Sequence, residues 1–197
     1  MKAKFETREE WLMAVVEELR PLFKQAGTPL PAAKLMRFTV SFPWQGARAS
    51  IIGQHFPVSM SKDGTHEMLV HPKMDDPYQV VGTVCHELVH AACPPDAKHG
   101  PLFKKLGKAV GLVGKPKFMG NGPEFDKAVT DPLLKKLGAY PHAGFDVHGK
   151  NGVKKQSTRL LKCECPDCGY LARVSAKWID DVGPPVCPTD GVPMEAA

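Results

Sequence analysis

The segment that decides the fold reads Cys85-His86-Glu87-Leu88-Val89-His90-Ala91. It lies inside a longer helical pattern, because apolar residues recur at helical spacing through it, at Val80, Val81, Val84, Leu88, Ala91 and Ala92. Asp76-Pro77 supplies an N-cap and a first-turn proline, and Pro94-Pro95 ends the pattern. On this helix His86 and His90 lie on one face, one turn apart.

Two histidines at this spacing can bind one zinc ion through their imidazole nitrogens. We expect Glu87 to project beside the metal and to act as general base for a water that attacks an amide carbonyl. The third ligand is expected to be His99, because the double proline turns the chain back and Gly100 permits a tight backbone there. The pattern therefore predicts a catalytic zinc held by three histidines.

Other interpretations of this segment stay open at the level of sequence. Cys85 and Cys93 are alternative soft donors, although lone cysteines are more often small packing residues of the core. His86 and His90 can also be ordinary helix residues beside a solvated Glu87. A metal bound there can be structural rather than hydrolytic.

The residues on either side of this helix predict an α+β body. A capping box at residues 7–10 starts a first helix, and further helices are expected over 101–110 and near 132–137. Segments rich in β-forming residues lie at 37–42, 47–52 and 67–70, and we expect them to form a small antiparallel sheet. Residues 144–152 are rich in glycine and polar residues, so domains are expected at 1–148 and 149–197.

The C-terminal part carries a second group of potential metal ligands. Cys165 and Cys168 share a C-x-x-C turn, and Cys187 begins a similar turn after eighteen intervening residues. We favour Asp190 as the fourth ligand because it makes the two turns symmetrical, and Cys163 is the alternative. This spacing predicts a zinc ribbon with a structural zinc, as opposed to a reduced, metal-free tail.

The composition indicates a soluble globular protein. The 197 residues are 43% hydrophobic with a formal net charge of +5. No stretch approaches the roughly eighteen consecutive apolar residues of a membrane span. Six cysteines without an apolar export segment favour reduced thiols over disulfides. We therefore expect a cytoplasmic monomer that binds a protein or peptide substrate and no membrane.

Positive charge is concentrated where the two predicted domains join. Residues 150–177 contain seven cations, against the two acids Glu164 and Asp167. The cations are Lys150, Lys154, Lys155, Arg159, Lys162, Arg173 and Lys177. With Tyr170 and Trp178 nearby for stacking, this stretch can contact the phosphates and unstacked bases of DNA. A solvated linker followed by an ordinary hairpin surface is the alternative.

Together these residues resemble the SprT-like zinc metalloprotease family, and most closely its compact bacterial and phage-type members. The family pattern is a His-Glu-x-x-His helix, then a His-Gly with an aromatic residue shortly after, then a C-terminal zinc ribbon. Here the pattern is matched by residues 85–91 and by His99-Gly100-Pro101-Leu102-Phe103. The resemblance extends to residues 61–67 and 155–162, and Asp190 departs from it.

The resemblance implies a zincin-like metalloprotease domain, in which a small antiparallel sheet packs with the histidine helix and flanking helices, followed by a zinc ribbon. It also implies three histidine ligands, a catalytic glutamate, and cleavage of proteins on or crosslinked to DNA, by analogy with a eukaryotic member. The leading hypothesis is thus a zinc-dependent metalloendopeptidase with one catalytic and one structural zinc. The competing hypothesis is a zinc-ribbon nucleic-acid-binding or transcription-associated protein with little or no protease activity. A hydrolase of small amides is a third.

Overall fold

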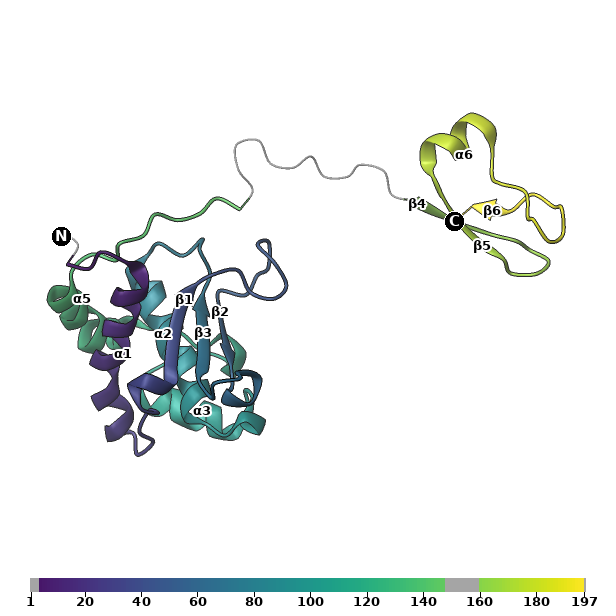
Figure 1. Cartoon of the computed structure of the whole chain (residues 1–197). Coiled ribbons are helices and arrows are strands. Elements are labelled where there is room, and N and C mark those ends of the chain that lie inside the picture. The colour runs from purple at the N-terminus through teal and green to yellow at the C-terminus, as the bar shows by residue number, and fades with distance from the viewer. Residues whose placement is uncertain (1–3, 148–159, 197) are drawn as a thin grey trace. The chain divides into compact units, whose positions relative to one another are not determined.

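The computed structural model describes residues 4–147 and 160–196. The chain divides into two compact units, Met1–His148 and Gly149–Ala197 (Figure 1). Each unit has a hydrophobic core of its own. Helices and strands of the first unit are α1 (Arg8–Gln25), β1 (Met36–Val40), β2 (Gly53–Phe56), β3 (His66–Val70), α2 (Pro77–Ala92), α3 (Pro101–Ala109), α4 (Pro123–Phe125) and α5 (Asp131–Leu137). Short 3-10 turns lie at Ala33–Leu35, Val58–Met60, Pro95–Ala97 and Pro116–Phe118.

The sheet of the first unit has the strand order β1-β3-β2. β1 runs parallel to β3, with Met36 opposite His66, whereas β2 runs antiparallel to β3, with Gly53 opposite Val70. The α+β class is confirmed, but the expectation of a purely antiparallel sheet is wrong. Alternating polarity predicts that a segment is a strand but carries no information about its neighbours, and here the third strand inserts between the first two.

The second strand also lies later than expected. Residues 47–52 form a loop, and the strand is Gly53–Phe56. Pairing begins just before it, because the backbone N–H of His71 donates to the carbonyl of Ile52 at 2.8 Å. The β-branched residues Ile51 and Ile52 therefore precede the strand and are not part of it.

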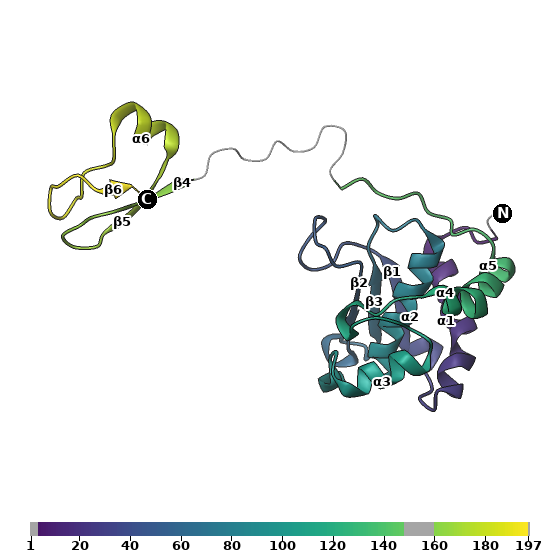
Figure 2. The ribbon, with the colours of Figure 1, turned by 180° about the vertical axis from the view of Figure 1, so that it is seen from behind.

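Helices α1 and α2 cover one face of this sheet (Figures 1 and 2). The predicted capping box is present, since the hydroxyl of Thr7 accepts from the N–H of Glu10 and the Glu10 carboxylate accepts from the N–H of Thr7. α2 begins as predicted, with the Asp76 carboxylate accepting from the N–H of Tyr78 at 3.0 Å. Almost every side chain of α2 from Val80 onward is buried, so this helix forms the centre of the unit.

A helical segment longer than expected follows α3. It runs through α4, a π-helical turn η5 (Asp126–Thr130) and α5, so that the helix expected near 132–137 is only its last part. Its apolar side faces the core, where the buried residues are Phe125, Leu133, Leu134 and Leu137. The segment leading into it, residues 119–121, lies against α2.

The second unit is built from β4 (Leu160–Glu164), β5 (Leu171–Ser175), α6 (Ala176–Val182) and β6 (Glu195–Ala196). Its sheet has the order β5-β4-β6, and both pairings are antiparallel. The buried apolar residues are few: Cys163, Cys165, Cys187 and Met194. Among the residues that the structure describes, no helix has the length and apolarity to cross a membrane.

Candidate metal centres

Three imidazoles meet at the C-terminal half of α2. The Nε2 atom of His99 lies 3.3 Å from Nε2 of His86 and 3.1 Å from Nε2 of His90. One ligand atom from each histidine lies within 4.8 Å of the other two. The structure thus brings together the three histidines expected from the sequence, and the two on α2 occupy successive turns of one face as their spacing predicts.

The dimensions of this cluster fit a zinc ion. A tetrahedral zinc with Zn–N bonds of about 2.0–2.1 Å separates two ligand nitrogens by about 3.4 Å. The observed separations of 3.1 and 3.3 Å are close to that value. Three ring nitrogens facing one point repel one another unless a cation or a shared proton lies between them. A metal ion bound between them would account for the convergence.

The protonation of the rings suits the same ion. Burial lowers the pKa of His86, and burial with the neighbouring histidines lowers the pKa of His90 to about 3. The Nδ1–H of His86 donates to the carbonyl of Met119 at 2.8 Å, which leaves the lone pair of Nε2 for the metal. The histidines are therefore held neutral, the form in which imidazole binds metal.

Two aromatic side chains that were not predicted as metal ligands pack against the rings. Phe103 of α3 is fully buried, and its ring centroid lies 4.4–4.9 Å from those of all three histidines. His55 of β2 stacks parallel to His90 at 6.0 Å and pairs with His66 through a 2.8 Å nitrogen–nitrogen contact. His55 and His66 have no sequence spacing relative to α2, so only the register of the sheet reveals them.

His99 reaches the cluster through an unusual turn. After the 3-10 turn at Pro95–Ala97, Lys98 adopts a φ of 43°, a conformation that side-chain-bearing residues rarely adopt. The expected tight backbone at Gly100 is not found in its dihedral angles, since its φ is −77°. Gly100 matters for space, because a Cβ there would lie 2.9 Å from the carbonyl oxygen of Ala97.

Glu87 directly follows the first of these histidines on α2 and is only 4% exposed. Burial raises the pKa of its carboxyl to about 8. Gly53 of β2 makes room for it, because a Cβ at position 53 would lie 2.5 Å from Glu87 Oε1. A nearby dication would favour the carboxylate form and oppose the effect of burial. A carboxylate of this kind can accept a proton from a group within hydrogen-bond reach.

The second unit holds the other cluster, formed by Cys165, Cys168, Cys187 and Asp190. Two similar turns build it. The N–H of Gly169 donates to the carbonyl of Cys165 at 3.0 Å, and the N–H of Gly191 donates to that of Cys187 at 3.0 Å. Both glycines have positive φ, 73° and 68°, as such turns require. Asp190 thus occupies in the second turn the place that Cys168 occupies in the first.

The distances within this cluster also fit a tetrahedral metal. The sulfurs of Cys168 and Cys187 are 3.6 Å apart, and Asp190 Oδ2 lies 3.3 Å from the sulfur of Cys165. Zn–S bonds of about 2.3 Å place two sulfurs about 3.8 Å apart. The hydrogen bond from Cys168 lowers the pKa of Asp190 and raises that of Cys168 to about 12.

The remaining cysteines lie outside both clusters. Cys163, the alternative fourth ligand, is buried on β4 opposite Ala172 and Ala196. Cys85 is fully buried in the core of the first unit, where burial raises its pKa, and Cys93 is the C-cap of α2. Cys85 and Cys163 thus occupy the packing role that lone cysteines commonly have.

No family model, curated protein or solved structure matches this chain. The chemistry of each cluster is therefore argued from its own geometry.

Three of the seven cations expected to contact DNA lie in the described part of the chain. Lys162 and Arg173 are opposite one another on β4 and β5, Lys162 pairs with Glu164, and Lys177 lies over the ring of Trp178. The other four, Lys150, Lys154, Lys155 and Arg159, lie outside the described residues. Residues 160–196 also carry six acids, Glu164, Asp167, Asp180, Asp181, Asp190 and Glu195, so this unit is acidic apart from the linker.

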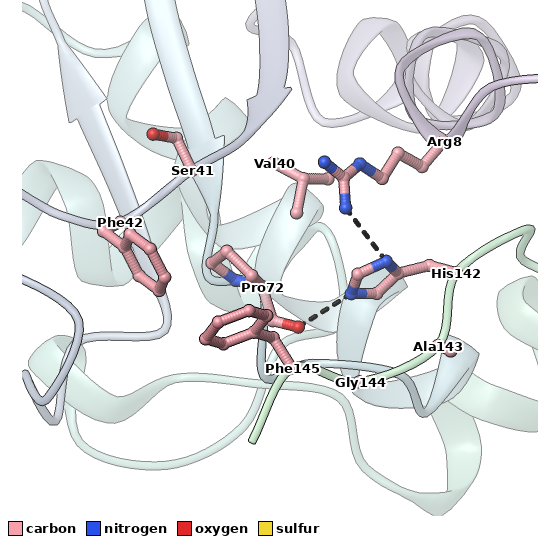
Figure 3. A pocket seen from close by; sticks show the side chains of 9 residues that line it. All are labelled: Arg8, Val40, Ser41, Phe42, Pro72, His142, Ala143, Gly144 and Phe145. Carbon is pink, nitrogen blue, oxygen red and sulfur yellow. Dashed lines mark hydrogen bonds between the residues drawn. The ribbon is translucent and has the colours of Figure 1, made fainter. Parts of the chain in front are cut away.

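The first unit also has a hollow of about 380 Å³ (Figure 3), and none of the three clustered histidines lines it. Phe42, Phe145, Arg8 and His142 are among the residues that line it. Its polar groups bond one another: Arg8 donates to Nδ1 of His142 at 3.1 Å, and Nε2 of His142 donates to the carbonyl of Pro72 at 2.7 Å. We assign this hollow no part in the metal chemistry.

Proposed function

We propose that this protein is a zinc-dependent metalloendopeptidase of the SprT-like type, with a zincin-like catalytic unit and a C-terminal zinc ribbon. The observation that carries the proposal is the convergence of three histidine Nε2 atoms, with that of His99 3.3 and 3.1 Å from those of His86 and His90, on a helix that also carries the buried carboxylate of Glu87. The combination of three neutral nitrogen ligands and one carboxylate outside the ligand set is typical of hydrolytic zinc sites.

Each residue has a defined task in this proposal. His86, His90 and His99 would hold the zinc, which when bound supplies Lewis acidity to a water and to the substrate carbonyl. The Glu87 carboxylate accepts the proton of the attacking water and passes it to the leaving amine. Gly53 allows that carboxylate to lie against β2, and Phe103 keeps the histidine rings packed.

The position of β2 favours a peptide substrate over a small amide. In the strand order β1-β3-β2, the outer side of β2 is unpaired among the described residues. This strand begins at Gly53, next to Glu87. An extended peptide can add to such an edge through its backbone groups and so place one of its amide bonds near the carboxylate.

Substituting Glu87→Gln tests the mechanism. The amide cannot take a proton, so hydrolysis of a protein substrate should fall by about 10²–10⁴-fold, the usual contribution of a general base. Zinc content measured by mass spectrometry should stay at the wild-type value, because Glu87 is not a ligand. Glu124→Gln, on an exposed residue of the same unit, is the matched control. Unchanged proteolysis in Glu87→Gln would overturn the mechanism.

We also propose that the substrates are DNA-associated proteins, recruited through the basic stretch. Support comes from the cations at 150, 154, 155 and 159, because the second unit is itself acidic over 160–196. The exposed rings of Tyr170 and Trp178 are available for stacking on unpaired bases.

Replacing these four linker cations by glutamine tests the proposal on DNA. Binding to duplex DNA across a salt series should lose about three to four units of slope in log K against log salt, since each phosphate contact contributes about 0.9. Replacing four exposed body lysines, Lys34, Lys104, Lys105 and Lys108, is the matched control and should leave the slope nearly unchanged. Steep, linker-dependent DNA binding without cleavage of any DNA-bound protein would favour the alternative of a zinc-ribbon binding or transcription-associated protein.

A further inference from the structure

One metal ligand is held by a segment that the proposed mechanism does not use. Nδ1 of His86 donates to the carbonyl of Met119, which lies on the segment Met119–Gly120–Asn121. We propose that this segment, locked by a hydrogen-bonded latch of Asn121, Asp126 and Thr130, positions His86 and thereby sets the zinc affinity of the histidine cluster. The inference rests on the proposed zinc site and assigns Asn121 as a positioning residue.

Two glycines inside helices make room for the segment. A Cβ at Gly82 of α2 would lie 2.5 Å from Asn121 Oδ1 and 3.0 Å from the Asn121 backbone nitrogen. A Cβ at Gly107 of α3 would lie 2.9 Å from the sulfur of Met119. Glycine within a helix costs about 1 kcal/mol relative to alanine. Each of the two helices has this less stable residue at the point where the segment lies against it.

The latch fixes the far end of the segment. Nδ2 of Asn121 donates to both carboxylate oxygens of Asp126, at 2.8 and 2.9 Å. The hydroxyl of the fully buried Thr130 donates to Asp126 Oδ1 at 2.9 Å. Asp126 and Thr130 are the first and last residues of the π-helical turn η5. Such turns are rare and frequently occur at functional sites.

Backbone pairing with Val113 fixes the middle residue of the segment, Gly120. The N–H of Val113 donates to the carbonyl of Gly120 at 2.9 Å, and the N–H of Gly120 donates to that of Val113 at 3.1 Å. The pairing of Gly120 and the latch at Asn121 together hold the Met119 carbonyl at hydrogen-bond distance from Nδ1 of His86.

None of the latch residues belongs to the histidine cluster, so their effect on the metal passes through the Met119 carbonyl. If that carbonyl moves, His86 loses the acceptor that fixes its tautomer and ring orientation. Removing such outer partners of ligating histidines typically weakens metal binding by about 10–100-fold. This weakening separates a positioning role from a purely structural one.

A charge-swap cycle in the full-length protein tests the proposal. Asn121→Asp places two carboxylates face to face, and the double variant Asn121→Asp with Asp126→Asn restores the donor–acceptor pair in reverse. Zinc release is measured by titration with a competing chromophoric chelator, in which each zinc site gives one step. The step that is absent in His99→Ala is assigned to the histidine cluster. We expect Asn121→Asp to weaken that step by about tenfold or more, the swap to recover most of the loss, and the ribbon step to stay unchanged.

Asp63→Asn is the matched control. Asp63 also accepts side-chain hydrogen bonds, from Ser61, Thr65 and Arg37, but in a turn whose contacts include no metal ligand. This variant should leave the histidine step unchanged. Thermal unfolding of the metal-free proteins measures the structural cost of each variant. If Asn121→Asp does not fold, Thr130→Val removes one donor at constant shape and should weaken the step by severalfold.

The outcomes separate this inference from the proposed function. A wild-type chain that binds zinc at the histidines with an affinity unaffected by Asn121→Asp, or by Thr130→Val where the former does not fold, would overturn the latch and leave the peptidase proposal standing. Failure of the swap to recover the affinity would overturn it also. A wild-type chain without any zinc step at the histidines would overturn both.

Discussion

At the scale of single residues, the absence of a side chain at position 53 is as important to the candidate site as the carboxylate at position 87. Gly53→Ala would place a Cβ 2.5 Å from Glu87 Oε1 and 2.6 Å from a methyl carbon of Thr83. The carboxylate must then shift, and a displacement of about 1 Å at a reacting group can cost on the order of a hundredfold in rate. We expect proteolysis to fall by at least tenfold in Gly53→Ala, with zinc content unchanged.

Gln54→Ala in the same strand is the control for this prediction. Gln54 is the next residue of β2, and its side-chain oxygen accepts from the N–H of Trp44. Because side chains alternate between the faces of a strand, Gln54 is directed away from α2. If steady-state rates of proteolysis fell equally in Gly53→Ala and Gln54→Ala, the effect would not be specific to the space at position 53, and the prediction would be contradicted.

The same residues show what the sequence reveals about the site and what it leaves hidden. His86, Glu87, His90 and His99 were predicted because their side chains have a spacing that follows from the geometry of a helix and its turn. His55, Met119 and Gly53 were not predicted. They contribute a ring from a neighbouring strand, a backbone carbonyl and an empty volume, and none of these leaves a pattern along the chain.

At the scale of elements, the start of α2 sets the position of the metal-ligating face. The Asp76 carboxylate accepts the N–H of Tyr78, and Pro77 occupies the first turn. Asp76→Ala should lower the free energy of unfolding of the first unit by about 1 kcal/mol, the usual cost of losing an N-cap. Asp76→Asn keeps an acceptor and should be nearly neutral. Denaturant unfolding of both variants measures the difference, and equal losses would contradict the capping role.

Helices were easier to predict than the sheet. The caps at Thr7 and Asp76 and the prolines at 94 and 95 are local signals, so the starts of α1 and α2 and the end of α2 were predicted from neighbouring residues. The insertion of β3 between β1 and β2 depends on contacts between residues far apart in sequence. The π-helical turn at 126–130 was not predicted because such turns are rare, and the helical signals of the sequence do not distinguish one from an ordinary helical turn.

At the scale of the whole molecule, we expect the two units to differ in how much their folding depends on metal. The first unit has a large apolar core that includes Trp11, Phe23 and Phe103. In the second unit, two of the four buried core residues, Cys165 and Cys187, belong to the metal cluster itself. A unit with so small a core folds only when a metal or crosslink stabilises it.

Metal content and chelation test this difference. We expect two zinc ions per wild-type chain and one in each of His99→Ala and Asp190→Ala, measured by mass spectrometry. A strong chelator should unfold the second unit and leave the first folded, which amide NMR signals from each unit report separately. Retention of dispersed signals from residues 160–196 after complete zinc removal would contradict a structural role for the metal.

The close approach of Gly53 to Glu87 also bears on how related chains diverge. A side chain at position 53 and a carboxylate at position 87 compete for the same volume. Where catalysis has been lost, the carboxylate at 87 is no longer needed and a side chain at 53 is tolerated. Where catalysis is kept, a side chain at 53 is not tolerated. Among homologous sequences, replacements at 53 should therefore accompany loss of the glutamate at 87, and under the proposed function this pair of positions would separate peptidases from binding proteins. Larger residues at 53 in chains that keep the glutamate and cleave their substrates would contradict this.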